Sequence, residues 1–198
     1  MSVREHKRAA PARLRVAVLT ASDSRSAATD DSGHLLVELL ARAGHAIAGY
    51  RVVKDDVRAI RAAARDLLRD ADALLVNGGT GASPRDVTPE ALAPLLRCEL
   101  PGFGEAFRRA SAAQVGTAAI ASRALAGVTR EGKIVAALPG SPQGCRLAMR
   151  AILLPELSHL VHVARGRPPS GTTARPRRRP PSRRKARAAE RARRPRSR

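Results

Sequence analysis

A short apolar run that stops at a glycine-rich turn is the feature that most limits how this chain can fold. Leu74–Val76 is continuously apolar, which is typical of a strand buried on both faces. Three glycines then fall within the four residues Gly78-Gly79-Thr80-Gly81. Glycines in such a turn let backbone N–H groups point into a concave surface and let a ligand approach closely. The segment indicates either a phosphate-binding turn or an ordinary strand-to-helix turn, and the glycines alone do not decide between them.

A single carboxylate, Asp86, follows the glycines and would suit a metal ion or a polar group of a ligand. Two familiar phosphate motifs are excluded. No Lys-Ser or Lys-Thr follows the turn, and Pro84 stands where Gly-x-Gly-x-x-Gly would have its third glycine. Thr88 as N-cap and Pro89 as first helical residue predict a helix after this segment. The chain between turn and helix is therefore long enough to wrap a ligand.

The first half of the chain alternates between strand and helix patterns. Apolar and β-branched runs predict strands at 14–21, 46–53 and 72–77. Leucine and alanine at helical spacing predict helices between these strands, the first capped by Asp31 or Ser32 and the second by Asp55. This order implies right-handed crossovers and a parallel sheet.

The second half adds a hairpin and further helices. Helices are predicted at 88–96 and from 101 to about 113, an extended segment at 118–129 and a strand at 133–138. A turn at 130–132 would join the last two segments into a hairpin and make the sheet mixed. Ser141 is expected to cap a last helix that Pro155 would kink. The predicted fold class is α/β, with a mostly parallel sheet and one hairpin.

Polar turns follow four of the predicted strands. They hold Ser22-Asp23, Asp55, the glycine turn with Asp86, and Pro139-Gly140-Ser141. Because parallel strands end at one edge, where ligands bind, these turns would share one rim. Acids and backbone amides around one cleft fit a phosphorylated ligand with a divalent cation. Taken singly, each has an ordinary interpretation as a helix cap, a turn former or the end of a strand.

The basic charge is concentrated at the ends of the chain. Of the net charge of +20, most lies in residues 166–198, which hold 14 Lys and Arg against one Glu and have no Leu, Ile, Val, Phe or Met. We expect this Arg/Pro-rich tail and the arm at 1–13 to be disordered, leaving one domain at 14–165. The tail would bind polyanions non-specifically or, the favoured interpretation, be a dispensable solvated extension.

Composition excludes several classes of function. With no Trp, one Tyr and two Phe, the domain lacks aromatic platforms for nucleic-acid bases. Cys98 and Cys145 match no zinc or redox spacing, the histidines form no metal pair, and His34 and His45 are expected at the surface. No apolar run reaches membrane-spanning length and no signal-peptide core is present, so a cytoplasmic protein without membrane contact is expected. Ser141 has no nearby base in the sequence, which disfavours a serine nucleophile.

Several ordered motifs resemble the MoaB/Mog family of molybdenum-cofactor biosynthesis proteins. They are Asn77–Gly81, Asp86–Glu90, Pro101–Glu105, Ser122–Ala124 and Leu138–Pro142, with Ser22-Asp23 and Asp31–Gly33 also similar to that family. The resemblance covers about residues 14–163. Asn77 departs from it, because the family usually has Thr or Ser there.

The resemblance implies a three-layer α/β/α fold, a homotrimer or homohexamer, and molybdopterin adenylyltransferase activity. In that reaction Mg-ATP adenylylates the terminal phosphate of molybdopterin and releases pyrophosphate. Asp55 and Asp86 would be catalytic and would hold Mg²⁺. The residues that would bind ATP and molybdopterin are Ser22, Asp23, Gly78, Gly79, Thr80, Gly81, Pro139, Gly140 and Ser141.

Two other functions remain open at this point. A MoaB-type protein could bind molybdopterin or a nucleotide without turnover, with the tail binding nucleic acid non-specifically. A nucleotide hydrolase of the CinA kind is also possible, although Pro101–Glu105 favours MoaB/Mog.

Overall fold

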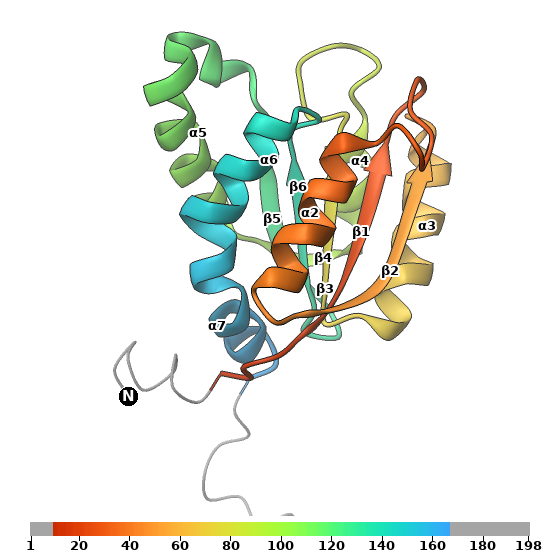
Figure 1. Ribbon diagram of the computed structural model, residues 1–198, viewed down its shortest axis with the longest axis vertical. Coiled ribbons are helices and arrows are strands. Elements are labelled where there is room, and N and C mark those ends of the chain that lie inside the picture. The colour runs from red at the N-terminus through yellow and green to blue at the C-terminus, as the bar shows by residue number, and fades with distance from the viewer. Residues whose placement is uncertain (1–9, 167–198) are drawn as a thin grey trace, which may run out of the picture. The chain divides into compact units, whose positions relative to one another are not determined.

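The computed structural model describes residues 10–166, which form a six-stranded mixed sheet covered by helices on both faces (Figure 1). The strand order is β2-β1-β3-β6-β5-β4. The strands are β1 (Arg15–Ala21), β2 (Ala46–Val53), β3 (Ala73–Asn77), β4 (Leu96–Glu99), β5 (Leu125–Thr129) and β6 (Ile134–Leu138). Strands β2, β1, β3 and β6 are parallel, whereas β5 is antiparallel to β6 and β4. The predicted mixed sheet and its hairpin are confirmed.

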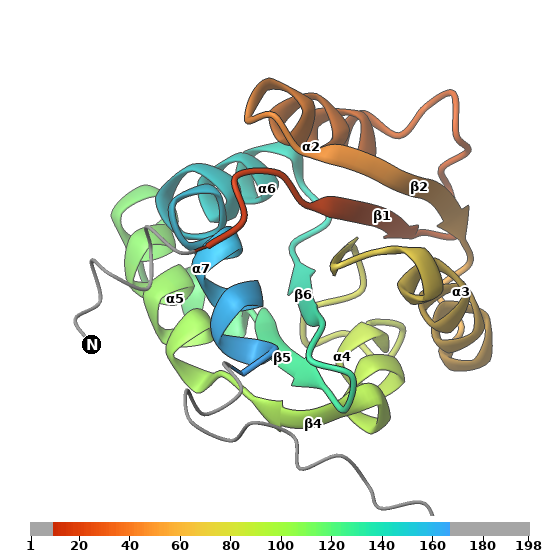
Figure 2. The same cartoon turned by 90° about the horizontal axis from the view of Figure 1, so that it is seen from below.

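Two helical layers enclose the sheet (Figure 2). The helices are α2 (Asp31–Arg42), α3 (Val57–Asp70), α4 (Thr88–Leu92), α5 (Pro101–Val115), α6 (Pro142–Ala148) and α7 (Leu154–Ala164). Three shorter turns are the 3-10 helices η1 (Ala93–Leu95) and η2 (Gly116–Ala121) and the π-helix η3 (Met149–Leu153). One core lies under α2, α5, α6 and α7, and the other lies under α3 and α4. The three-layer architecture is therefore as expected.

The central strands are apolar on both faces because each face meets a helical layer. In β1, Val16 and Val18 belong to one core and Ala17 and Leu19 to the other, and all four are fully buried. Every residue of β3 is buried as well. A continuous apolar run is the pattern that a parallel strand covered on both sides requires.

Two predicted helix caps are off by one residue. Asp30, not Asp31 or Ser32, caps α2, and its carboxylate accepts a hydrogen bond from the Gly33 N–H at 3.0 Å. Asp56, not Asp55, caps α3 and accepts from the Ala59 N–H at 2.8 Å. In both helices the side-chain oxygen of the capping aspartate accepts from the backbone N–H of the third residue after it. Asp55 is therefore free of the ordinary role that local sequence suggested.

Two segments between β3 and β6 differ from the prediction. The helix expected at 88–96 is α-helical to Leu92 and continues as the 3-10 helix η1 to Leu95; β4 then follows as an unpredicted edge strand whose Arg97, Cys98 and Glu99 are exposed. Exposure on both faces leaves no apolar alternation from which a strand could be predicted. The segment expected to be extended from 118 begins instead with η2, and β5 starts only at Leu125.

Helices α6 and α7 form one continuous stretch, Pro142–Ala164, that is long and apolar enough to cross a membrane by length and composition alone. Its buried residues are Cys145, Ala148, Met149, Leu153, Leu157 and Val161, all of which belong to the core. Packing in the core accounts for part of the apolar character, since 28% of the apolar window is buried. The π-helix lies just before Pro155, whose ring would meet the carbonyl of Ala151 in a regular α-helix, so the wider turn accommodates the proline.

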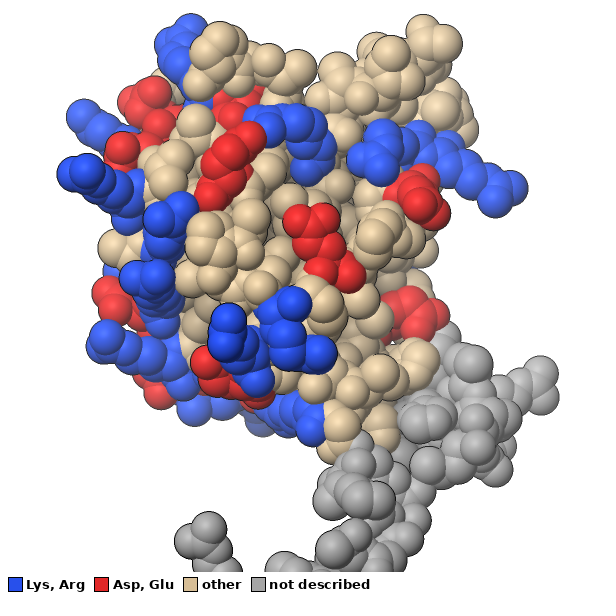
Figure 3. Space-filling model, turned by 180° about the vertical axis from the view of Figure 1, so that it is seen from behind, with Lys and Arg blue, Asp and Glu red and all other residues tan. Residues whose placement is uncertain are grey.

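Charge on the described surface is uneven. Figure 3 looks at the molecule from behind, where Lys and Arg side chains gather along one edge and the lower part. Helix α3, which covers the second core, carries exposed Arg58, Arg65 and Arg69. The arm at 1–9 and the tail at 167–198 lie outside the described residues, so the disorder expected of both, and the two roles considered for the tail, stay predictions.

Candidate functional site

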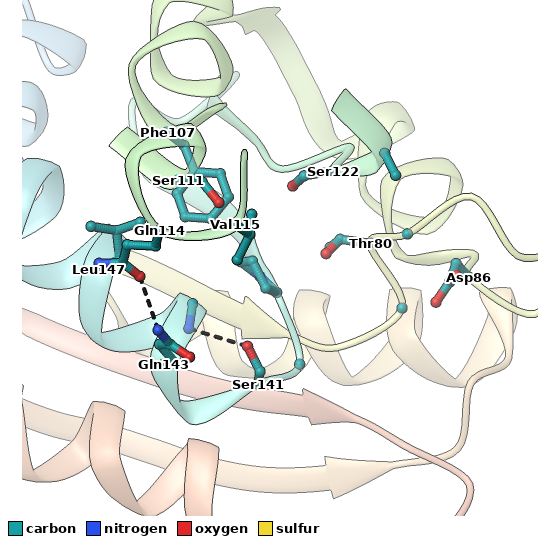
Figure 4. A pocket seen from close by; sticks show the side chains of 16 residues that line it. Thr80, Asp86, Phe107, Ser111, Gln114, Val115, Ser122, Ser141, Gln143 and Leu147 are labelled. Atoms are coloured by element: carbon teal, nitrogen blue, oxygen red, sulfur yellow. Dashed lines mark hydrogen bonds between the residues drawn. The ribbon is translucent and has the colours of Figure 1, made fainter. Parts of the chain in front are cut away.

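The carboxyl ends of β2, β1, β3 and β6 lie at one edge of the sheet, and a cleft of about 460 Å³ opens beside β3 and β6 (Figure 4). One wall is made by the glycine turn, Asp86 and the turn after β6. The opposite wall comes from α5, η2 and α6. The residues named from the sequence that line the cleft are Gly79, Thr80, Gly81, Asp86, Pro139, Gly140 and Ser141.

The backbone of the glycine turn leaves no room for a side chain at two positions. Gly78 and Gly79 have positive φ angles of 94° and 60°. A Cβ atom at Gly78 would lie 2.1 Å from the Ala21 carbonyl oxygen, and one at Gly79 would lie 2.6 Å from Thr88 Oγ1. The Thr88 hydroxyl donates to the Gly78 carbonyl at 2.8 Å, and the Thr88 backbone N–H donates to the Gly79 carbonyl at 3.0 Å. Thr88 therefore pins the turn rather than capping α4 as predicted.

The turn is also tied to the end of β6. The Gly78 N–H and the Thr80 hydroxyl both donate to the Leu138 carbonyl, at 3.2 and 3.3 Å. By contrast, the N–H groups of Gly79, Thr80 and Gly81 donate to no group within the described residues. Three consecutive amides of residues that line the cleft thus have unused hydrogen-bonding capacity, an arrangement suited to phosphate oxygens.

Asp86 folds back toward this turn. Its carboxylate accepts a hydrogen bond from the Ser83 N–H at 2.9 Å, and its own N–H donates to the Ser83 carbonyl at 2.9 Å. A Cβ atom at Gly81 would lie 2.8 Å from Asp86 Oδ2, so a side chain there would displace the carboxylate. The short loop thus presents Asp86 beside the amides of the turn.

Asp55 lies beside Gly79 and does not itself line the cleft. A Cβ atom at Gly79 would be 2.8 Å from Asp55 Oδ1, and this oxygen is buried without a hydrogen-bond partner among the described residues. The Asp55 N–H donates to Asp23 Oδ1 at 3.3 Å. Burial, followed by the negative charges of Asp23 and Asp86, raises the pKa of Asp55. Asp55 is therefore close enough to Asp23 and to Asp86 to be repelled by both.

Ser22 has a local task. Its hydroxyl oxygen accepts from the backbone N–H groups of Ser24 and Arg25, at 3.3 and 3.2 Å, and so stabilises the turn after β1. Ser141 caps α6 as predicted, accepting from the Gly144 N–H at 3.1 Å. Ser141 lines the cleft while Ser22 does not.

Sequence reasoning missed the opposite wall of the cleft. It comes mainly from Phe107, Ser111, Gln114 and Val115 of the α5 helix, and from Gln143 and Leu147 of α6 (Figure 4). Gln143 Nε2 donates to Gln114 Oε1 at 3.2 Å across the two helices. Helical spacing predicts α5, but only the tertiary packing of α5 against α6 shows that this side faces the glycine turn.

The described residues contain no group of three His, Cys, Asp or Glu side chains arranged to hold a metal ion. Asp55, Asp23 and Asp86 nevertheless supply hard oxygen atoms, one of them without a partner. Mg²⁺ is commonly bound by one or two carboxylates together with water and substrate phosphates. The donor set fits such a shared cation and does not fit a closed, all-protein metal site.

Comparison with known proteins agrees with this architecture. A family model described as a probable molybdopterin binding domain matches residues 17–159. The molybdenum cofactor biosynthesis protein B of Bacillus subtilis (strain 168) is 48% identical over 168 residues, which are 83% of this chain and 98% of that protein.

Solved structures give the same result. A crystal structure of a molybdenum cofactor biosynthesis protein B superposes with a TM-score of 0.75 at 44% identity, covering 78% of this chain and 98% of that one. The tungsten cofactor synthesizing protein MoaB from Pyrococcus furiosus gives a TM-score of 0.72 at 34% identity, covering 79% and 99%. This chain therefore belongs to the MoaB/Mog family of molybdenum-cofactor biosynthesis proteins.

Proposed function

We propose that this protein is a molybdopterin adenylyltransferase that transfers the adenylyl group of Mg-ATP to the terminal phosphate of molybdopterin. The observation that carries the proposal is the set of three unused amides at Gly79, Thr80 and Gly81, held at the cleft beside Asp86. Membership of a molybdenum-cofactor family supplies the substrate class. The cleft has room for more than a phosphate, since its volume is about 460 Å³.

In the proposed reaction, an oxygen of the molybdopterin phosphate bonds to the α-phosphorus of ATP, and the bond to the departing pyrophosphate breaks. The attacking phosphate is already an anion at neutral pH, so no protein base has to remove a proton. The work left to the protein is positioning and charge stabilisation. The turn amides would hold phosphate oxygens, and the apolar side chains of Phe107, Val115 and Leu147 would exclude water from the heterocyclic part of a substrate.

Asp86 and Asp55 are the residues that would hold Mg²⁺. The fit rests on the unpartnered Asp55 oxygen and on the raised pKa of Asp55, which is caused first by burial and then by the charges of Asp23 and Asp86, because a bound cation would favour the ionised carboxylate. When bound, Mg²⁺ would neutralise the negative charge that gathers on the phosphate oxygens. We further propose that the protein acts in the cytoplasm as a homotrimer or homohexamer.

The test is an assay for pyrophosphate and adenylylated molybdopterin with purified protein, ATP, Mg²⁺ and molybdopterin. We expect the wild type to release pyrophosphate only when molybdopterin is present. Asp86→Asn and Asp55→Asn should each lower kcat by about 10²-fold or more, because each removes a charge that stabilises the transition state.

Asp56→Asn is the matched control. It makes the same chemical change next to Asp55 and retains a residue that caps helices well, so its kcat should stay close to that of the wild type. Near-normal turnover by Asp86→Asn would remove Asp86 from the mechanism. Tight binding of ATP and molybdopterin by the wild type without pyrophosphate release would instead identify a binding protein.

A further inference from the structure

Arg123 joins segments that are distant in the sequence around the loop between β3 and α4. Its backbone N–H donates to the Thr80 carbonyl at 2.8 Å, and its side-chain Nε donates to the Gly81 carbonyl at 2.7 Å. Its remaining guanidinium nitrogens donate to the Asp86 carbonyl and to the Glu90 carboxylate. One residue thus contacts the loop near its start and at its end, and also the helix that follows it.

We propose that Arg123 is a positioning residue that clamps the loop 78–87 from behind and so sets the place of Asp86 and of the turn amides. This inference rests on the proposed adenylyl transfer at the same site. Arg123 acts through the loop, because it is absent from the lining of the cleft although its neighbour Ser122 is part of it.

The loop needs such a clamp because it has little structure of its own. No helix or strand includes residues 78–87, and the internal hydrogen bonds of the excursion join Ser83 to Arg85 and to Asp86. The Thr88 contacts fix only its beginning, at Gly78 and Gly79. Beyond these, the bonds that tie Gly81 and the Asp86 backbone to the rest of the fold come from Arg123.

An arginine beside a phosphate-binding turn would ordinarily be expected to bind the phosphate. Here Nε and both terminal nitrogens already donate within the protein. The planar fork of the guanidinium reaches two carbonyls and a carboxylate at once, whereas a lysine carries one compact charge on a flexible stem. The geometry requires arginine for its shape as well as for its charge.

Glu90 is the third contact of the guanidinium and lies outside the loop, in α4. The hydrogen bond from Arg123 is the main cause of the lowered pKa of Glu90, so this carboxylate stays ionised and paired at neutral pH. The ion pair is half-exposed, with 37% of the Arg123 side chain and 54% of the Glu90 side chain accessible. The two backbone carbonyls, which do not titrate, are therefore the contacts on which the position of Asp86 depends.

The first experiment measures the loop directly, without substrates. Amide hydrogen exchange is followed in the wild type, Arg123→Gln and Arg123→Lys. Exchange at residues 81–87 should become faster in both variants, while β1 and β3 keep their protection. Unchanged exchange at 81–87 would overturn the proposal whether or not the protein proves to be an adenylyltransferase.

The second experiment measures steady-state adenylylation and its Mg²⁺ dependence. We expect Arg123→Gln to lower kcat by about 10- to 100-fold, since displacements near 1 Å at a reacting centre have effects of that size. The Mg²⁺ concentration for half-maximal rate should rise, because Asp86 is no longer held. A merely structural role would lower the melting temperature and leave kcat per folded molecule and the Mg²⁺ dependence unchanged, which would also overturn the proposal.

Three variants separate the shape of the Arg123 side chain from its charge. Arg123→Lys keeps the charge, but its kcat should stay below that of the wild type. Millimolar guanidinium should partly restore the kcat of Arg123→Ala but not that of Arg123→Lys. Glu90→Gln leaves both carbonyl contacts in place and should change kcat less than about threefold, in line with the small effect of exposed ion pairs. Full activity in Arg123→Lys would show that charge alone suffices and would contradict the clamp.

Discussion

Asp55 and Asp56 are neighbours in the sequence, yet they have separate tasks at the start of α3. Asp56 accepts the Ala59 N–H at 2.8 Å and caps the helix. Asp55 instead places a buried, unpartnered oxygen beside Gly79 and toward the other acids at the carboxyl edge of the sheet. The helix is stabilised by the second aspartate, which leaves the first available for a cation or a ligand.

This division predicts opposite effects on stability. Asp56→Ala should lower the free energy of unfolding by about 0.5–2 kcal/mol through loss of the cap. Asp55→Asn should not lower it at neutral pH. Folding raises the pKa of Asp55, so the native state binds more protons than the unfolded chain. The contribution of Asp55 to stability therefore falls as the pH rises from the ordinary pKa of an aspartate through the raised pKa of the folded state. Denaturant unfolding at pH 4 and pH 7 would check both; a destabilised Asp55→Asn at pH 7 would contradict the assignment.

The glycine turn predicts a second contrast. Gly79→Ala would put a Cβ atom 2.6 Å from Thr88 Oγ1 at a backbone φ of 60°, so the turn must move and both stability and nucleotide binding should fall. Gly102→Ala is the control, since a Cβ atom there meets nothing within 4 Å and the site lies in α5. Melting temperature and ATP binding would be measured for both variants, and equal behaviour would refute the role given to the turn.

Ser32 is predicted to steady the second turn of the cleft. Its buried hydroxyl donates to the Gly140 carbonyl at 2.7 Å, which ties α2 to the turn after β6. Ser32→Ala should cost about 1 kcal/mol of stability, the usual value of one such bond. If Gly140 contacts substrate, KM should rise more than kcat falls. An unchanged KM in Ser32→Ala would show that the turn after β6 does not contribute to substrate binding.

His45 should make the protein less stable in mild acid. Contrary to the surface position expected for it, the ring is buried, and its Nδ1 accepts the Leu14 N–H at 3.3 Å. Burial lowers the pKa of His45 from its ordinary value of 6.5, so the unfolded chain binds more protons than the native state in mild acid. The free energy of unfolding therefore falls as the pH drops through 6.5 toward the lowered pKa of the folded state. Unfolding free energies measured between pH 7.5 and pH 5 should show this loss, and His45→Gln should reduce the slope.

Local patterns account for the sheet, the hairpin and the turns at the carboxyl edge, because these depend on apolar runs and on glycine, proline and capping residues close in sequence. They could not separate Asp55 from Asp56, since either aspartate fits the start of α3. They also missed β4, whose residues are exposed at the edge of the sheet. The wall built from α5 and the contacts of Arg123 arise from residues far apart in sequence, such as Arg123 and Gly81, and become visible only in the folded chain.

The account depends most directly on whether the open amides of the glycine turn receive phosphate. Amide chemical shifts of Gly79, Thr80 and Gly81 can be followed by nuclear magnetic resonance as Mg-ATP is added, with Gly102 and Gly132 as reference glycines away from the cleft. We predict large shifts at the three turn amides, reduced in Asp86→Asn, and little change at the reference glycines. Saturating Mg-ATP that leaves these three amides unshifted would contradict the account.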